Sequence, residues 1–237
     1  MFLLGCFLVR ESIAGFFAVL PFLIIYHIFL IRKRKSNSNG TDGKSAIPHI
    51  TAAYVFCFYL VGVLDITGIS NMINYTSPIF RYAININLIP FQDVSHLYQQ
   101  YISNMILFIP LGFLLPVLWK RFEKIKPTFI LGLLFSFTIE AAQVLTHRAT
   151  DIDDIIMNTS GTIIGYFLFI LIKKISPKIT EVFNDNDAVY LGWEVNLYFI
   201  FTWLAVIFIQ TFISSWLLKT FVFPYNPTNY GVVDIIT

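Results

Sequence analysis

The sequence predicts an all-α, polytopic integral membrane helix bundle of about six transmembrane helices, with both chain ends outside (N-out and C-out). Of the 237 residues, 57% are hydrophobic and 13% are charged, and that charged share is roughly half of what an ordinary soluble domain carries. Six apolar runs approach the ~20 residues that a helix needs to cross the hydrocarbon core of a bilayer. This composition excludes a disordered chain, a nucleic-acid-binding protein and an ordinary cytosolic enzyme.

The six apolar runs occupy residues 13–31, 47–69, 103–119, 128–146, 155–172 and 196–218. The third run contains Pro110, Gly112 and Pro116, which a membrane helix tolerates where its neighbours satisfy the freed backbone groups. The fourth and fifth runs are joined by a short loop, so we expect them to be antiparallel neighbours. Gly161 and Gly165 form a small-xxx-small pair that favours close helix packing.

The positions of Lys and Arg predict the orientation of the bundle. Twelve of the 16 basic residues lie in the loops after the first, third and fifth spans, which is the pattern of cytoplasmic loops. Both chain ends and the loops at 70–102 and 147–154 are therefore expected outside. The twelve residues are Arg32, Lys33, Arg34, Lys35, Lys44, Lys120, Arg121, Lys124, Lys126, Lys173, Lys174 and Lys178.

Three parts of the chain can be separated by composition. Residues 1–46 are an N-terminal anchor helix followed by a basic cytoplasmic linker, whose polar stretch at 36–46 is typical of a flexible connection. Residues 47–175 form a membrane domain of four spans. Residues 176–237 contain a cytoplasmic loop, the sixth transmembrane helix and an outer tail.

Polar residues inside the fourth and fifth spans are the main candidates for function, because ionisable groups in membrane spans are rare and usually functional. Glu140 lies six residues before the outer end of the fourth span, about 9 Å deep at ~1.5 Å per residue. Gln143 follows at i+3 on the same face. On the fifth span, Asp151, Asp154 and Asn158 follow one another at i+3 and i+4, so the two polar faces can meet.

The outer loops add groups that could bind an anion. Arg81 and Asn87 precede the third span, Asn104 opens that span, and Arg148 stands between the fourth and fifth spans. Arginine binds phosphate or carboxylate groups through two parallel hydrogen bonds. Together these residues predict an anionic headgroup bound in a pocket at the outer leaflet.

The carboxyl groups allow two other chemistries. Glu140 or Asp154, if partly desolvated, could act as a general acid or base. Asp151, Asp153 and Asp154 are weak candidates for a hard cation such as Mg²⁺ or Ca²⁺, which prefers oxygen ligands. Because no strong metal-ligand spacing is present, no cofactor is expected.

The same residues also have structural interpretations. Arg148 could pair with Asp151 or Asp154 and stabilise the loop between the fourth and fifth spans. Glu140 could be a protonated packing residue that is held by hydrogen bonds. Asn104 could only cap the third span.

Four other polar residues are expected to have no functional role. Asp65 lies near the outer end of the second span and is expected to be solvated there. His27, His49 and His96 have no partner at metal-ligand spacing and are expected to be bystanders.

Separated motifs in a fixed order resemble the VanZ-like family over about residues 50–172. The segments are 87–91 (NLIPF), 104–112 (NMILFIPLG), 136–143 (SFTIEAAQ), 148–154 (RATDIDD) and 158–165 (NTSGTIIG). The motif residues that the resemblance marks are Arg81, Asn87, Pro90, Phe91, Asn104, Pro110, Gly112, Glu140, Gln143, Arg148, Asp151, Asp153, Asp154, Asn158 and Gly161. The first and sixth spans lie outside it.

The resemblance implies a multi-pass protein of the bacterial cytoplasmic membrane, and the namesake of the family gives low-level resistance to teicoplanin, a lipid-tailed glycopeptide. We therefore expect a protein that binds or handles an anionic lipid, a lipid-linked cell-wall precursor or a lipoglycopeptide at the outer leaflet. The alternative is a membrane-embedded hydrolase or phosphotransferase that uses Glu140 and Asp154 as acid and base on a lipid-linked substrate. A structural or transport role is a third possibility.

Overall fold

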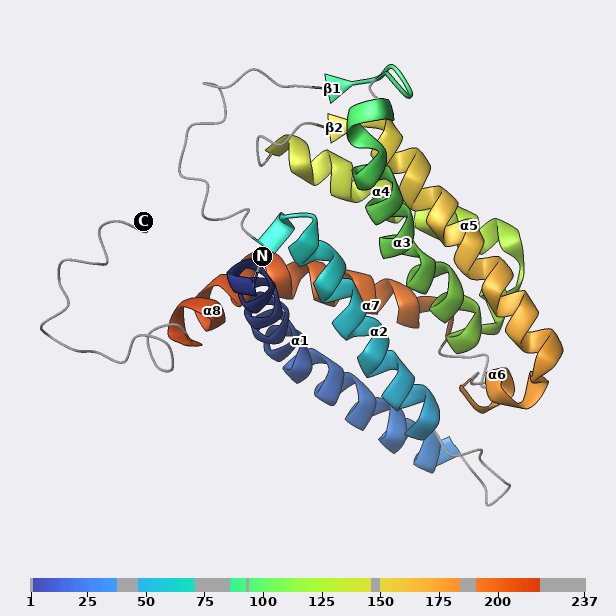
Figure 1. The fold of residues 1–237 in the computed structure, drawn as a ribbon. Coiled ribbons are helices and arrows are strands. Elements are labelled where there is room, and N and C mark those ends of the chain that lie inside the picture. The colour runs from blue at the N-terminus through green and yellow to red at the C-terminus, as the bar shows by residue number, and fades with distance from the viewer. Residues whose placement is uncertain are drawn as a thin grey trace, which may run out of the picture.

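The computed structural model describes residues 2–37, 47–70, 86–92, 94–145, 150–183 and 191–217, and helices dominate them (Figure 1). The helices are α1 (Phe2–Asn37), α2 (Ile47–Ile66), α3 (Val94–Leu118), α4 (Ile125–Leu145), α5 (Ile152–Ile175), α6 (Pro177–Phe183), α7 (Leu191–Ala205) and α8 (Thr211–Leu217). A 3₁₀ turn (Lys120–Glu123) precedes α4, and a π-helical turn (Val206–Gln210) joins α7 to α8. Two short strands, β1 (Ile86–Asn87) and β2 (Thr150–Asp151), complete the described elements.

The predicted helix bundle with six spans is confirmed. In the described residues, six helices are long and apolar enough to cross a membrane. Their spans are Val9–Arg32, Ile47–Ile66, Leu97–Leu118, Ile125–Val144, Ile152–Ile175 and Trp193–Trp216. The expectation that Asn104 opens the third span is wrong, because α3 begins at Val94. Hydropathy detects the apolar part of a helix, whereas the backbone hydrogen bonds of α3 extend through the polar turns before it.

The two ends of the bundle differ in chemistry. β1 and β2 lie together where α3 and α5 begin and α4 ends (Figure 1). The opposite end carries exposed basic side chains, including Lys120, Lys124 and Lys126 after α3 and Lys174 in the last turn of α5. We call these the strand end and the basic end. The separation of charge that the sequence predicts is therefore present in the fold.

Glycines let α5 pack directly against the backbone of α3. A Cβ atom on Gly112 would lie 1.8 Å from the carbonyl oxygen of Thr162, and one on Gly161 would lie 2.0 Å from that of Met105. Gly165 makes a third contact of the same kind. The close packing predicted from the glycine pair is present, and α3 is the helix it meets. α4 also packs against α5 as expected.

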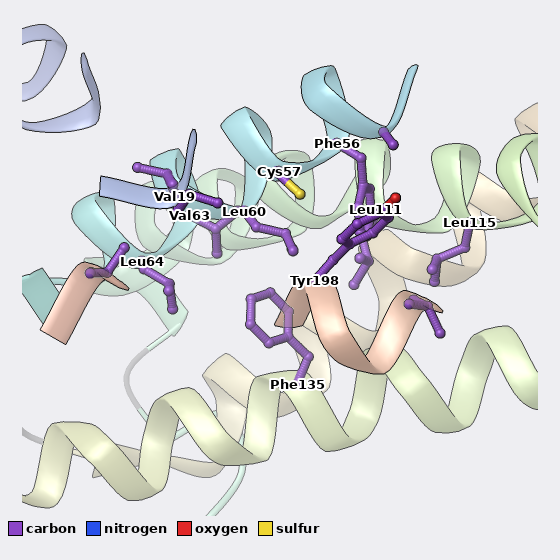
Figure 2. Close-up of a cluster of buried hydrophobic side chains, with 14 of the residues drawn as sticks. Val19, Phe56, Cys57, Leu60, Val63, Leu64, Leu111, Leu115, Phe135 and Tyr198 are labelled. Atoms are coloured by element: carbon purple, nitrogen blue, oxygen red, sulfur yellow. The ribbon is translucent and has the colours of Figure 1, made fainter. Parts of the chain in front are cut away.

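The apolar core lies where α1, α2, α3, α4 and α7 meet, while the other apolar faces point outward. Figure 2 shows this core, in which Val19, Phe56, Cys57, Leu60, Val63, Leu64, Leu111, Leu115, Phe135 and Tyr198 are labelled. Many large apolar side chains elsewhere are exposed, such as Phe137 on α4 and Phe167 on α5. This distribution is typical of helices whose outer faces contact lipid rather than water.

Candidate functional site

Two segments that are far apart in the sequence meet in a short parallel ribbon at the strand end. Ile86 stands opposite Thr150, and Asn87 stands opposite Asp151. The side-chain amide of Asn87 donates to Oδ2 of Asp151 over 3.3 Å. Because the pairing is parallel, the chain enters both strands from the same end.

The acidic sequence that follows β2 starts α5. Asp151 is the N-cap of this helix, and its Oδ1 accepts the backbone N–H of Asp153 at 2.9 Å. Asp153 and Asp154 occupy the first turn, where the helix dipole favours negative charge. The three carboxyl groups therefore stabilise the N-terminus of α5, which is a structural reason for their positions.

Asp153 fixes the turn that follows β1. Both of its carboxylate oxygens accept the backbone N–H of Phe91 at 3.0 Å, and Oδ2 also accepts the hydroxyl of Tyr101 at 2.5 Å. Phe91 has a φ of 59°, a left-handed conformation that is uncommon for a non-glycine residue. The fully buried carboxylate thus compensates for an unfavourable backbone at the start of α3.

Asp154, at the start of α5, joins this helix to the N-terminal half of α3. Gln100 donates its side-chain amide to both carboxylate oxygens at 3.1 and 3.2 Å, and Asn104 donates to Oδ1 at 2.6 Å. Gln100 and Asn104 are four residues apart and so share one face of α3. The role of Asn104 is to donate to Asp154 across the helix interface rather than to cap a helix.

Glu140 holds the start of α5 from the side of α4. Its Oε2 accepts the backbone N–H of Asp151 at 3.3 Å, and its backbone carbonyl accepts the hydroxyl of Thr150 at 3.3 Å. One turn further along α4, the amide of Gln143 donates to the carbonyl of Thr67 at 3.0 Å. Both side chains are buried, so they join α4 to β2 and to the end of α2.

Asn158 lies deeper in the bundle than the carboxylates. Its side-chain amide donates to the hydroxyl of Ser136 on α4 at 3.0 Å, and both side chains are buried. The polar stripe predicted along α5 therefore divides in two. Asp154 contacts α3, whereas Asn158 contacts α4.

We use the name polar cap for the side chains that these bonds join at the strand end. They are Asn87, Gln100, Tyr101, Asn104, Glu140, Asp151, Asp153 and Asp154. In the part of the chain that the structure describes, the donors that reach Asp151, Asp153 and Asp154 are neutral amides, a phenol and backbone N–H groups. Across the described residues, no three His, Cys, Asp or Glu side chains gather in a way that could hold a metal ion. The polar cap is therefore a frame of hydrogen bonds that joins α3, α4 and α5.

Two predicted anion-binding residues, Arg81 and Arg148, fall outside the residues that the structure describes. In the sequence, Arg148 precedes β2 by two residues and Arg81 precedes β1 by five. Both arginines therefore belong to segments that lead into the paired strands.

The polar cap contains two residues that the sequence did not suggest, Gln100 and Tyr101. Gln100 and Asn104 are spaced at i and i+4, which places them on one helix face. This spacing predicts a shared partner only if α3 begins before residue 100, as it does in the structure. No pattern in the sequence predicts that the hydroxyl of Tyr101 donates a hydrogen bond, because its partner Asp153 is 52 residues away.

Tyr101→Phe is expected to destabilise the protein by about 1.5–3 kcal/mol, the usual contribution of a hydrogen bond to a charged group. The change leaves the ring in place and removes a donor from buried Asp153. Thermal unfolding of the purified protein measures the loss, and hydrogen exchange at Phe91 should become faster. The control is Tyr98→Phe, which alters an exposed hydroxyl and should change stability by about 0.5 kcal/mol or less. Equal effects of the two variants would contradict this role of Tyr101.

A second buried polar cluster lies toward the basic end, and the sequence did not predict it. Glu194 on α7 accepts Nε2 of His49 at 3.0 Å and the indole N–H of Trp119 at 2.7 Å through one oxygen. Its other oxygen accepts the hydroxyl of Tyr198 at 2.8 Å, and that hydroxyl lies 3.0 Å from Nε2 of His27. We call these five residues the Glu194 cluster, which connects α1, α2, α3 and α7.

The ring of His49 lies between two groups that offer acceptor oxygens. Its Nδ1 faces the carbonyl oxygen of Phe183 at 2.9 Å, and its Nε2 faces the carboxylate of Glu194. Glu194 also accepts from Trp119. His49 and Glu194 therefore form a buried pair, which is an ion pair when both ring nitrogens carry protons.

The expectation that Asp65 is solvated is wrong, and two of the histidines that were expected to be bystanders rather than ligands hold helices together. His27 and His49 belong to the Glu194 cluster, and both are buried. Asp65 is 5% exposed rather than solvated, because α1 and the π-helical turn cover it. Each residue has partners from helices remote in sequence, which spacing along the chain cannot reveal. His96 has no described side chain.

Fold and site together define a multi-pass integral membrane protein in which a polar cap joins three of the spans. The chain belongs to the VanZ/LLP1 family, which it matches over residues 50–173, and it is thus a bacterial membrane protein. It is similar to protein VanZ of Enterococcus faecium, with 33% identity over 121 residues that cover 51% of this chain and 74% of that protein. No solved structure matches the chain. The family match contains α2 to α5, whereas α1, α7 and α8 lie outside it.

Proposed function

We propose that this protein binds an anionic lipid or a lipid-linked cell-wall component at the outer leaflet and thereby gives low-level resistance to teicoplanin or related lipoglycopeptides. The resistance part of the proposal rests on membership of the VanZ/LLP1 family and on the resemblance to VanZ. The binding part rests on the polar cap and on the two arginines next to it in the sequence.

The observation that carries the binding proposal is the parallel pairing of β1 with β2. The segment that follows Arg81 and the segment that follows Arg148 enter this ribbon from the same end. Two guanidinium groups on adjoining segments suit a phosphate, which each can bind through two hydrogen bonds.

The hydrogen bonds of the polar cap support the same proposal. Asp153 and Asp154 are already bonded to neutral donors of α3 and of the turn at Phe91. These two carboxylates therefore have described hydrogen-bond partners of their own and serve as a frame at the strand end. In the proposal, Arg81 and Arg148 bind the external anion.

The positions of the basic side chains support an outward-facing polar cap. Lys124 and Lys174 are exposed at the basic end, and basic loops remain cytoplasmic.

In a background without the native cysteines, Leu88→Cys should react with a membrane-impermeant maleimide in intact cells, because Leu88 is 70% exposed at the strand end. Lys124→Cys should react only after the cells are permeabilised. The reverse labelling pattern would place the polar cap inside the cell.

Native mass spectrometry of the full chain extracted from bacterial membranes tests the binding. Arg81→Ala and Arg148→Ala should each reduce the retained anionic lipid or undecaprenyl phosphate species by about tenfold or more, since a charge-assisted hydrogen bond contributes ~1.5–3 kcal/mol. The matched control is Lys124→Ala, which removes an exposed charge at the basic end and should leave retention unchanged. If wild-type protein retains no anionic species, the binding proposal fails.

Glu140→Gln separates binding from catalysis. If the protein is a binder, teicoplanin susceptibility should change little, because glutamine still offers an oxygen to the N–H of Asp151. If it is a hydrolase or phosphotransferase with Glu140 and Asp154 as acid and base, the resistance should be abolished while lipid retention persists. The minimum inhibitory concentration of teicoplanin, measured with expression matched, distinguishes the two.

A further inference from the structure

A carboxyl group that has no charged partner among the described residues is buried at the strand end, apart from the polar cap. Asp65, near the end of α2, accepts the side-chain amide of Gln210 at 2.7 Å through Oδ1. Its Oδ2 has no hydrogen-bond partner within the described part of the chain, although the hydroxyls of Ser12 and Ser70 face the same carboxyl group. An ionised carboxylate is costly to bury when one of its oxygens lacks both a hydrogen bond and a charged partner. Asp65 differs in this respect from Asp153, and a cation at Oδ2 would neutralise it.

The charged groups that the structure describes near Asp65 do not supply that cation. Glu11 on α1 faces Asp65 and is itself negative. Arg10 donates to the carboxylate of Glu11 through Nε at 3.1 Å, and Ser214 on α8 donates to it at 2.6 Å. The charge of Arg10 thus offsets that of Glu11, and the charge of Asp65 remains.

The π-helical turn directs Gln210 toward this carboxyl group. If the last span were a regular helix, the side chains of Glu194 and Gln210 would be about 160° apart around its axis. The one extra residue of the π turn reduces this angle to about 60°, so that the two residues lie on nearly the same side of the helix. Gln210 consequently has no exposed surface, and its amide also donates to the backbone carbonyl of Glu11 at 3.1 Å. π turns occur frequently at functional sites.

A second buried oxygen in the same place lacks a partner. Oε1 of Gln210 makes no hydrogen bond and lies against α1, where a Cβ atom on Gly15 would be 2.5 Å from it. The absence of a side chain at Gly15 thus leaves room for this oxygen. Asp65, Gln210, Ser12 and Ser70 offer oxygen atoms, which are the ligands that hard cations prefer.

We propose that Asp65 and Gln210 form a binding site for one small monovalent cation, a proton or Na⁺, enclosed between α1, α2 and the π-helical turn. Asp65 lies within the part of the chain that matches the family, whereas Gly15 and Gln210 lie outside it. The two flanking spans therefore complete a cation site on the family domain, and bound cation stabilises their contact with α2.

Infrared spectroscopy of the full chain in lipid nanodiscs tests this site. The wild-type minus Asp65→Asn difference spectrum is recorded at neutral pH in choline chloride and in NaCl. A carboxylic acid C=O band in both buffers identifies a bound proton. A band that NaCl removes, or a carboxylate band that NaCl shifts, identifies bound Na⁺. A carboxylate band that is the same in both buffers overturns the proposal.

Two further measurements remove the dependence on one variant. Asp65→Asn should leave the Tm unchanged or raise it, because asparagine resembles the neutralised acid, whereas a large drop in Tm would indicate an ion pair and contradict the site. Asp151→Asn is the matched control at the same end, and its difference spectrum should show a carboxylate that does not respond to Na⁺.

Chemical modification of the wild-type protein gives an independent measurement. Dicyclohexylcarbodiimide reacts with protonated carboxyl groups and should modify Asp65 in choline chloride. Na⁺ should prevent this modification only if Na⁺ is the occupant.

Discussion

Gly112→Ala is expected to destabilise the protein by about 3 kcal/mol or more, the upper range for overpacking. The added methyl group would lie 1.8 Å from the carbonyl oxygen of Thr162 and 2.7 Å from its carbonyl carbon. Both atoms belong to the backbone of α5, so no side-chain rotation relieves the clash and α3 must move away from α5. The polar cap joins these same helices, and its hydrogen bonds should weaken with them.

The glycines of this chain provide a graded control series. Gly132→Ala would meet only the side chain of Thr162, at 2.6 Å, which can rotate, so its cost should be smaller. Gly62→Ala meets nothing within 4 Å and should be neutral or stabilising by up to ~1 kcal/mol, because alanine favours helix.

The buried thiol of Cys57 reports unfolding when a thiol-reactive fluorophore is added to a Cys6→Ser background. The Tm values should fall in the order Gly62→Ala, Gly132→Ala, Gly112→Ala. A Gly112→Ala protein as stable as Gly62→Ala would contradict the α3–α5 packing.

Glu194→Leu is expected to cost about 3–5 kcal/mol, the usual loss when one partner of a buried ion pair is removed. The change leaves the ring of His49 and the donors of Trp119 and Tyr198 without their shared acceptor. Because these partners come from α2, α3 and α7, we expect α7 to separate from the family domain before α3, α4 and α5 unfold.

The matched control is Glu123→Leu, which breaks an ion pair to Lys173 at 2.7 Å between half-exposed side chains and should cost about 1 kcal/mol or less. His49→Phe combined with Glu194→Leu should be less destabilising than the two single effects added together, since neither charge is then left unpaired. The Cys57 assay measures all four proteins. Additive losses would show that His49 and Glu194 do not form the pair described above.

Much of the architecture could be predicted from local properties of the sequence. Runs such as 128–146 are apolar over the thickness of a bilayer, and each must form a helix because lipid offers no hydrogen bonds to the backbone. The motif residues Asn87, Asp153 and Asp154 could be identified for a related reason. Their carboxyl and amide groups are exceptions in an apolar chain, so they are conspicuous without any structure.

The partners of those groups could not be predicted, because hydrogen bonds depend on which helices become neighbours. Tyr101 looks like one of many aromatic residues until α5 places Asp153 beside it. His49 and Glu194 are 145 residues apart, so spacing along the chain does not pair them. Asp65 appears solvated at the end of its span until α1 and the π-helical turn cover it.

The sequence by itself determined the six spans, the gathering of basic residues in alternate loops, and the polar motifs next to α3, α4 and α5. These follow from hydropathy and charge, which act along the chain and are visible in any short window of it. The tertiary structure alone decided that the motifs form a closed hydrogen-bonded frame, that Glu194 on the last span meets His49 and Trp119, and that the first and last spans cover Asp65. The physical reason is that a buried polar group is satisfied by whichever donor the packing brings near, and packing depends on all the helices at once.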